Sequence, residues 1–143
     1  MTNNANTDEL MKILKNADDT QILDTYVTDL EGVRTDFKSV VNSILLERDI
    51  SIADLQRKSC VARTYIYQIM DGTRNPGRDK ALSIALALEL PIDDTNRLLK
   101  LSSNAILYPK NRRDAIIIYC LNNKLSVGEC NRLLVRYEEA ELG

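Results

Sequence analysis

The chain has 143 residues, a formal net charge of −2 and a composition that is 44% apolar and 28% charged. These values are typical of one globular domain and exclude a disordered or fibrous protein, and the lack of histidine removes the commonest general base and metal ligand. The three scattered cysteines lack metal-site or disulfide spacing, the longest apolar run is seven residues, and no secretory signal is recognisable, so we expect a cytoplasmic protein with no membrane span and no cofactor.

Residues 1–32 are predicted to form an acidic N-terminal helical extension. Apolar spacing within residues 7–31 indicates two short helices, and residues 1–32 hold seven Asp or Glu against two Lys, a local net charge of −5. Residues 51–80 hold six Lys or Arg against three Asp, a local net charge of +3. Opposite charges attract, and we hypothesise that the acidic extension folds over the basic segment and inhibits it.

Five helices are predicted in the next part of the chain, residues 33–102. Apolar residues at i, i+3, i+4 and i+7 mark the first, serine caps the second, and Asp-Gly and Asn-Pro-Gly turns isolate the third. The expected helices begin at Thr35, run from about Ser51 to Ser59, from 62 to 70 and from about 78 to 89, and begin again at Asp93 or Asp94.

The C-terminal part of the chain repeats the segment before it. When residues 78–99 are shifted by 35 positions, eight of twenty-two residues are identical to those at 113–134, including a shared Asn-Arg-Leu-Leu. Self-similarity at a fixed offset is typical of stacked helical hairpins. We therefore predict a hairpin in residues 103–143, with helices at about 113–124 and 127–141, although a chance match between amphipathic helices would give a similar pattern.

The segment from Val40 to Leu99 resembles the helix-turn-helix domain of the phage-repressor and Cro-like family, also called the XRE family. Spacing of apolar and turn residues carries the resemblance, because it sets the angle between two consecutive helices and the loop after them. These residues are Ile50, Ser51, Leu55, Val61, Ile66, Ile69 and Gly72 to Pro76. The resemblance implies an all-α fold, with a lambda-repressor-like core of five helices in residues 33–102 between the N-terminal extension and the C-terminal hairpin.

The resemblance also implies that the helix of residues 62–70 enters the major groove of double-stranded DNA. On its outer face, Arg63 and Gln68 are expected to pair with guanine and adenine. Thr64 and Tyr67 are expected to contact a thymine methyl group or a phosphate. Cations expected to hold the DNA backbone are Arg74, Arg57 and Lys58.

Three positions depart from the family's pattern. Ile52 stands where a glutamine often holds a phosphate, Cys60 stands where the turn commonly has glycine, and Ala62 stands where Ser or Thr usually caps the reading helix. We expect a positive φ at Cys60 despite its Cβ, and a loss of roughly 1 kcal/mol of capping free energy at Ala62.

The implied function is sequence-specific DNA binding by a transcriptional regulator, most simply a repressor. Such domains usually bind pseudo-palindromic DNA as dimers, so we expect a homodimer, with residues 10–30 and 115–134 as candidate dimer surfaces, although apolar faces more often form core. These N-terminal and C-terminal helices are also candidate surfaces for a protein partner. The sequence has no phosphate loop, nucleophile elbow or metal-site spacing, so we do not expect an enzyme.

An alternative interpretation is a protein-interaction module that keeps the helix-turn-helix fold without binding DNA. Two tyrosines in the reading helix, Tyr65 and Tyr67, would then bind the partner together with the basic loop of residues 108–113. That loop is a second candidate site, for a phosphate or an acidic segment, although such a run is more often a solvated linker. Salt dependence separates the two functions, since DNA binding through several cations weakens steeply with salt.

Overall fold

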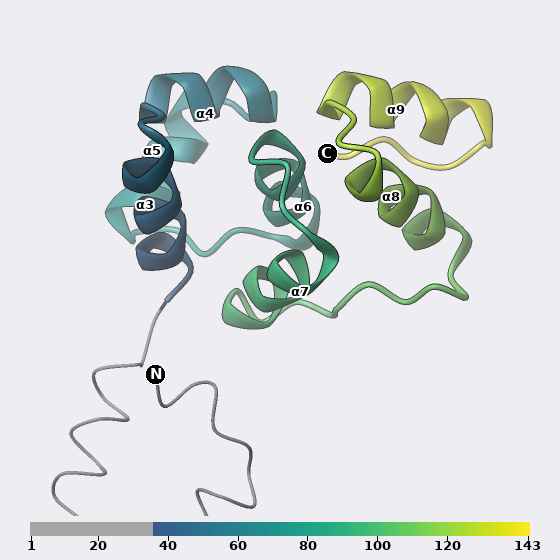
Figure 1. Cartoon of the computed structure of the whole chain (residues 1–143), viewed down its shortest axis with the longest axis horizontal. Helices are drawn as coiled ribbons and strands as arrows, with labels where there is room; N and C mark the ends of the chain where they lie inside the picture. Colours follow the sequence, from purple (N-terminus) through teal and green to yellow (C-terminus); the bar gives the residue numbers. More distant parts are fainter. Residues whose placement is uncertain (1–35) are drawn as a thin grey trace, which may run out of the picture. The chain divides into compact units, whose positions relative to one another are not determined.

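The structure, a computed structural model, describes residues 36–143, and the two helices predicted within residues 7–31 lie outside the described residues. Residues 36–143 form one compact unit that contains seven helices and no strand, so the predicted all-α fold is confirmed. Figure 1 shows α6 between the α3–α5 group and the α8–α9 pair. The helices are α3 (Phe37–Arg48), α4 (Ile52–Ser59), α5 (Arg63–Asp71), α6 (Arg78–Ala87), α7 (Ile92–Leu101), α8 (Arg112–Asn122) and α9 (Val127–Arg136).

Helix starts follow local capping chemistry. Ser51 caps α4 as predicted, with its hydroxyl accepting a hydrogen bond from the Asp54 N–H at 3.0 Å. The prediction for α3 was wrong by one residue, because the Asp36 carboxylate, not Thr35, accepts from the Ser39 N–H at 2.9 Å. The predicted start of α7 was also wrong: the helix begins directly after Pro91, whose fixed φ suits a helix entry, and Asp93 and Asp94 lie in its first turn.

Two helices end earlier than the sequence pattern indicated. α6 ends at Ala87 instead of near residue 89, and α9 ends at Arg136 instead of near residue 141. In both cases the chain soon takes a left-handed conformation, with φ of 52° at Glu89 and 60° at Glu138. A left-handed residue cannot continue a right-handed helix, so the apolar spacing that continues beyond it belongs to the following segment.

The core is built around α6. Its residues Ala81 to Leu86 are all buried, and the helix contacts α4 on one side and α7, α8 and α9 on the others. A helix that is buried around its whole circumference needs apolar or small side chains on every face. This central position means that α6 links the five-helix core to the C-terminal hairpin.

The offset of 35 residues that relates α6–α7 to α8–α9 in sequence also relates them in structure. α7 and α9 have equivalent bounds at this offset, Ile92–Leu101 and Val127–Arg136. Left-handed residues recur at Glu89 and Lys124, with φ of 52° and 53°. The two hairpins therefore share their turns as well as their helices.

Two crossed ion pairs join the hairpins. Arg78 donates two hydrogen bonds to Asp114, at 2.8 and 2.7 Å, and Arg113 donates two to Asp79, at 2.9 and 3.0 Å. Each arginine also donates to carbonyls of the segment after its own hairpin, at equivalent positions. The acceptors are Ala105 and Ile106 for Arg78, and Ala140 and Glu141 for Arg113. This reciprocal network fixes the start of α6. The loop of residues 72–77, which joins α5 to α6, leads directly into this fixed point.

Candidate nucleic-acid interface

The outer face of α5 carries the four polar side chains that the sequence singled out. Ile66, Ile69 and Met70 are buried and hold the helix against the core. Arg63, Thr64 and Tyr67 are exposed and Gln68 is half-buried. Residues three and four apart on a helix share a face, so these four side chains form one surface, which we call the α5 face.

The turn before α5 is fixed by hydrogen bonds that sequence reasoning missed. The buried Ser59 hydroxyl donates to the Gln56 carbonyl at 3.0 Å and accepts from the Val61 N–H at 3.3 Å, and the Gln56 side-chain amide donates to the Val61 carbonyl at 2.8 Å. Cys60 has a φ of 59°, so the expected positive φ is confirmed. Ala62 caps α5 with no side-chain hydrogen bond, also as expected.

The loop after α5 is held along its whole length. Gly72 ends the helix in a left-handed conformation at φ 86°. The Asp71 carboxylate accepts hydrogen bonds from the hydroxyl and N–H of Thr73, at 2.7 and 2.8 Å, and these bonds hold the pKa of Asp71 below its usual range. Further on, the Asn75 amide donates to the Ser102 carbonyl at 2.8 Å. The loop consequently presents Arg74 from a tethered backbone.

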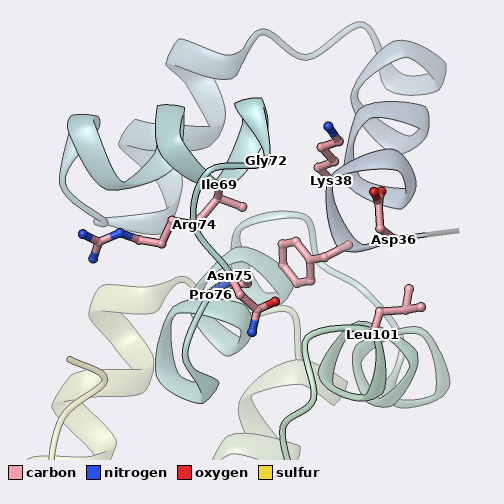
Figure 2. Close-up of a pocket in the computed structure, with 9 residues that line it drawn as sticks. Asp36, Lys38, Ile69, Gly72, Arg74, Asn75, Pro76 and Leu101 are labelled. Atoms are coloured by element: carbon pink, nitrogen blue, oxygen red, sulfur yellow. The ribbon is translucent and has the colours of Figure 1, made fainter.

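A cavity of about 180 Å³ lies beside this loop, and its walls include the start of α3 and the end of α7. Figure 2 shows Asp36 and Lys38 on one side of it, facing Asn75 and Pro76, while the guanidinium of Arg74 points away from it. A Cβ added at Gly72 would lie 2.8 Å from the Lys38 ammonium. Lys38 therefore adds a cation close to the end of α5, which sequence reasoning had not selected.

Both tyrosines of α5 hold cations. The guanidinium of Arg63 lies over the Tyr67 ring at 5.4 Å from the centroid. The guanidinium of Arg74 lies over the Tyr65 ring at 4.6 Å, and the ammonium of Lys80 lies 5.4 Å from the same centroid. Such contacts are cation–π interactions, favourable by about 0.5–1 kcal/mol at exposed sites. Arg63, Arg74 and Lys80 are thus oriented by the aromatic rings of α5.

The cations differ in whether a carboxylate neutralises them. Arg57 forms an ion pair with Asp54 one turn earlier on α4, and Arg78 pairs with Asp114. Within residues 36–143, no ion pair is formed by Arg63, Arg74 or Lys80. Unlike Arg57 and Arg78, these three cations therefore keep their charge available for an outside anion.

Lys58 is not brought to the α5 face. It borders a separate hollow of about 460 Å³, together with Arg48 and Leu88, with Lys124 of the α8–α9 turn and with Glu129 of α9. Lys58 follows Arg57 directly, and successive residues of a helix point about 100° apart. The structure thus places the two predicted backbone contacts of α4 in different surroundings.

The basic loop of residues 108–113 uses two of its cations internally. Arg113 pairs with Asp79, and Arg112 donates to the Tyr137 carbonyl at 2.8 Å and lies 3.7 Å from the Glu139 carboxylate. Lys110 is exposed. Most of the charge that made this loop a candidate site thus stabilises the C-terminal hairpin.

Comparison with known protein families matches residues 42–94 to the helix-turn-helix family. Residues 42–94 belong to this family, as a domain of the XRE, or Cro-like, type. The matched range runs from α3 to the first turn of α7, which is consistent with a lambda-repressor-like core. Domains of this family bind DNA and typically have no catalytic activity.

The helix-turn-helix domain contains all of the predicted site residues, which lie between residues 57 and 74. No curated protein and no solved structure matches the chain. Among the described residues, every helix is too short or too polar to span a bilayer. That part of the chain also holds no group of three or more His, Cys, Asp or Glu side chains suited to a metal ion.

Proposed function

We propose that the chain is a sequence-specific DNA-binding transcriptional regulator, most simply a repressor, that reads the major groove with α5. The observation that carries this proposal is the α5 face, where Arg63 rests on the Tyr67 ring without a carboxylate partner, beside the polar side chains of Thr64 and Gln68. Both turns that flank the helix are held by buried or loop hydrogen bonds. A rigid, cationic helix face is suited to a polyanion with a groove about 12 Å wide.

Each residue of the α5 face has a role that follows from its donors and acceptors. Arg63 offers two donors to the O6 and N7 of guanine, and Gln68 offers a donor and an acceptor to adenine. Thr64 and Tyr67 contact a thymine methyl group or a phosphate. Arg74 holds the backbone from the tethered loop, whereas Arg57 must first exchange its Asp54 partner for a phosphate.

A homodimer remains part of the proposal, since one reading helix covers only a few base pairs. The C-terminal candidate surface needs revision, because half of the apolar residues of 115–134 are buried and most of the others pack against the core. The buried ones are Ile117, Cys120, Leu121, Val127, Cys130 and Leu134. Within residues 115–137, Tyr119, Val135 and Tyr137 keep exposed fractions of 57%, 55% and 45%, and they are the large apolar side chains there that remain exposed for a partner.

The alternative of a protein-interaction module loses one of its anchors. Tyr65 is half-buried, its hydroxyl accepts a hydrogen bond from the Gly77 N–H at 3.2 Å, and its ring holds two cations. A side chain already used in this way has little surface to offer a protein partner. Tyr67, with 40% of its surface exposed, remains available.

The test is titration of labelled genomic duplex fragments with the purified full chain at low and moderate salt. The Arg63→Ala/Gln68→Ala double variant is expected to lose sequence selectivity, at about 1–3 kcal/mol for each base contact. Arg132→Ala/Asn122→Ala, which removes an exposed cation and an exposed amide from the C-terminal hairpin, is the matched control. If no fragment binds even at low salt, DNA binding is wrong and a protein partner takes its place.

A further inference from the structure

We propose that Tyr65 is a positioning residue for DNA binding, and that its ring holds Arg74 and Lys80 together as a two-cation clamp on the phosphate backbone. This inference rests on the proposed function and names a part of the interface that sequence reasoning missed. Lys80 was not among the predicted site residues, and Tyr65 was considered only as a contact for a protein partner.

Geometry places both cations on one aromatic ring. The Arg74 guanidinium and the Lys80 ammonium lie 4.6 and 5.4 Å from the Tyr65 centroid, so the two charges are at most about 10 Å apart. Arg74 comes from the loop after α5 and Lys80 from the first turn of α6. One side chain of the reading helix therefore aligns cations from the two segments that follow it.

The ring itself is anchored at both ends. Its body packs against the buried core, and its hydroxyl accepts the Gly77 N–H at 3.2 Å. The backbone between the two cations is tied down separately, since the Asn104 amide donates to the Pro76 carbonyl at 3.1 Å. The position of the Tyr65 ring is thus fixed relative to α5. The ring in turn fixes the positions of the Arg74 and Lys80 cations.

The two positive charges at the Tyr65 ring have no carboxylate partner within the described residues, so they can bind an anion from another molecule. Neither Arg74 nor Lys80 forms an ion pair within residues 36–143. Nearby carboxylates are already engaged, Asp71 by Thr73 and Asp79 by Arg113. Two like charges held near one ring repel each other, and a phosphate between or beside them relieves that repulsion.

Lys80 also occupies a position that helix stability does not favour. It lies in the first turn of α6, where the helix dipole disfavours a cation. The second hairpin offers an internal control, because Arg78, Asp79 and Lys80 correspond to Arg113, Asp114 and Ala115. The crossed ion pairs form equally well beside an alanine, so packing of the hairpins does not require a lysine.

The first step of the test uses the free protein. Ring-current shifts of the Lys80 and Arg74 methylene protons, measured by NMR, are expected in the full chain and in Tyr65→Phe, and are expected to vanish in Tyr65→Leu. Absence of these shifts in the wild-type chain would remove the clamp whether or not the protein binds DNA.

The second step titrates the same proteins with a mixed-sequence DNA duplex of about 20 base pairs at several salt concentrations. The readout is the slope of the logarithm of the binding constant against the logarithm of the salt concentration, to which each phosphate contact contributes roughly 0.9. Tyr65→Leu is expected to weaken binding about tenfold and to reduce the slope by about 1 to 2, while Tyr65→Phe keeps the wild-type slope. In an Arg74→Ala/Lys80→Ala background, Tyr65→Leu should have almost no further effect.

Three results would contradict the inference in different ways. An unchanged slope in a folded Tyr65→Leu protein means that Tyr65 does not position the cations. An equal loss from Tyr65→Leu with and without Arg74 and Lys80 means that its role is only structural. Failure of the wild-type chain to bind any duplex removes the proposed function itself, and the NMR shifts then show separately whether the ring holds the cations.

Discussion

The α6–α7 and α8–α9 hairpins share one design but have different surroundings. Ile84 of α6 is completely buried, whereas Tyr119, at the equivalent position of α8, is 57% exposed. α6 is covered by α4 of the helix-turn-helix domain, while α8 packs on α6, α7 and α9. The comparison shows that the packing on the outer face of a hairpin decides its place: α6 is the centre of the helix-turn-helix domain, whereas α8 lies at the side of that domain.

The crossed ion pairs show the same contrast in electrostatics. Asp114 keeps 6% of its side-chain surface exposed and Arg78 keeps 26%, against 29% for Asp79 and 20% for Arg113. Asp114 also accepts the Tyr108 N–H at 2.9 Å. The two equivalent ion pairs thus differ in how deeply the carboxylate is buried. Burial determines how far the free energy of unfolding falls when one partner is removed.

The largest expected effect comes from breaking the more buried pair. Asp114→Asn should lower the free energy of unfolding by about 2–4 kcal/mol, because it leaves the Arg78 guanidinium half-buried without a counter-charge. Asp79→Asn should lower it by about 1–2 kcal/mol, since solvent screens the more exposed carboxylate. Urea denaturation of both variants measures the difference, and equal losses would show that the hairpins are equivalent despite their different burial.

The same carboxylates predict a dependence of stability on pH. Burial acts to raise the pKa of Asp114 and of Asp79, but hydrogen bonds from the arginines and from the Tyr108 and Gly143 N–H groups, together with the arginine charges, hold both pKa values below the ordinary 3.8. A depressed folded-state pKa stabilises the protein above the unfolded value, and this stability is lost as the pH falls from about 4 through the folded pKa. Urea titrations between pH 6 and pH 3 should therefore show declining stability.

The Asp79→Asn/Asp114→Asn double variant is the matched control for this pH dependence. It lacks both depressed carboxyl groups, so it should lose less stability than the wild-type chain over the same pH range. If both proteins lose the same amount, the acid sensitivity comes from other groups and not from the crossed pairs.

The sequence was sufficient to predict the helices and the motif, because both depend on local spacing. Apolar periodicity located α3 to α9 to within a few residues, and the spacing from Leu55 to Pro76 identified the family. The predicted helix starts were wrong where two neighbouring residues could both cap the helix. Asp36 rather than Thr35 caps α3, since both side chains suit an N-cap and only the path of the chain decides between them.

The candidate site was only partly predictable, because its missing parts depend on contacts between segments. The polar residues of the α5 face follow from helical spacing alone. The contacts of Tyr65 with Arg74 and Lys80 depend on how the loop of residues 72–77 folds back, and nothing in residue spacing shows this. In the same way, the repeat showed two Arg-Asp pairs in sequence but not that each arginine would cross to the other hairpin.

A smaller effect is expected where the two hairpins are capped differently. The Asn111 side chain accepts the Asp114 N–H at 3.0 Å at the start of α8, whereas Gly77 starts α6 with no side-chain cap. Asn111→Ala should lower the free energy of unfolding by about 1 kcal/mol, and Gly77→Ser should raise it by a few tenths of a kcal/mol. A Cβ at Gly77 meets nothing within 4 Å, so a loss of stability in Gly77→Ser would contradict the capping argument.

A further small effect should be the same in both hairpins. Glu89 and Lys124 are exposed, take left-handed conformations at φ of 52° and 53°, and lie at equivalent positions between the two helices of each hairpin. Glycine relieves the steric cost of this conformation but adds freedom to the unfolded chain, so Glu89→Gly and Lys124→Gly should each stabilise the protein by about 0.5–1 kcal/mol. Thermal unfolding compares the two, and a gain in only one hairpin would mean that its side chain makes a contact that offsets the strain. Equal gains would show that the turn is set by the shared backbone, and that the hairpins differ only in what covers them.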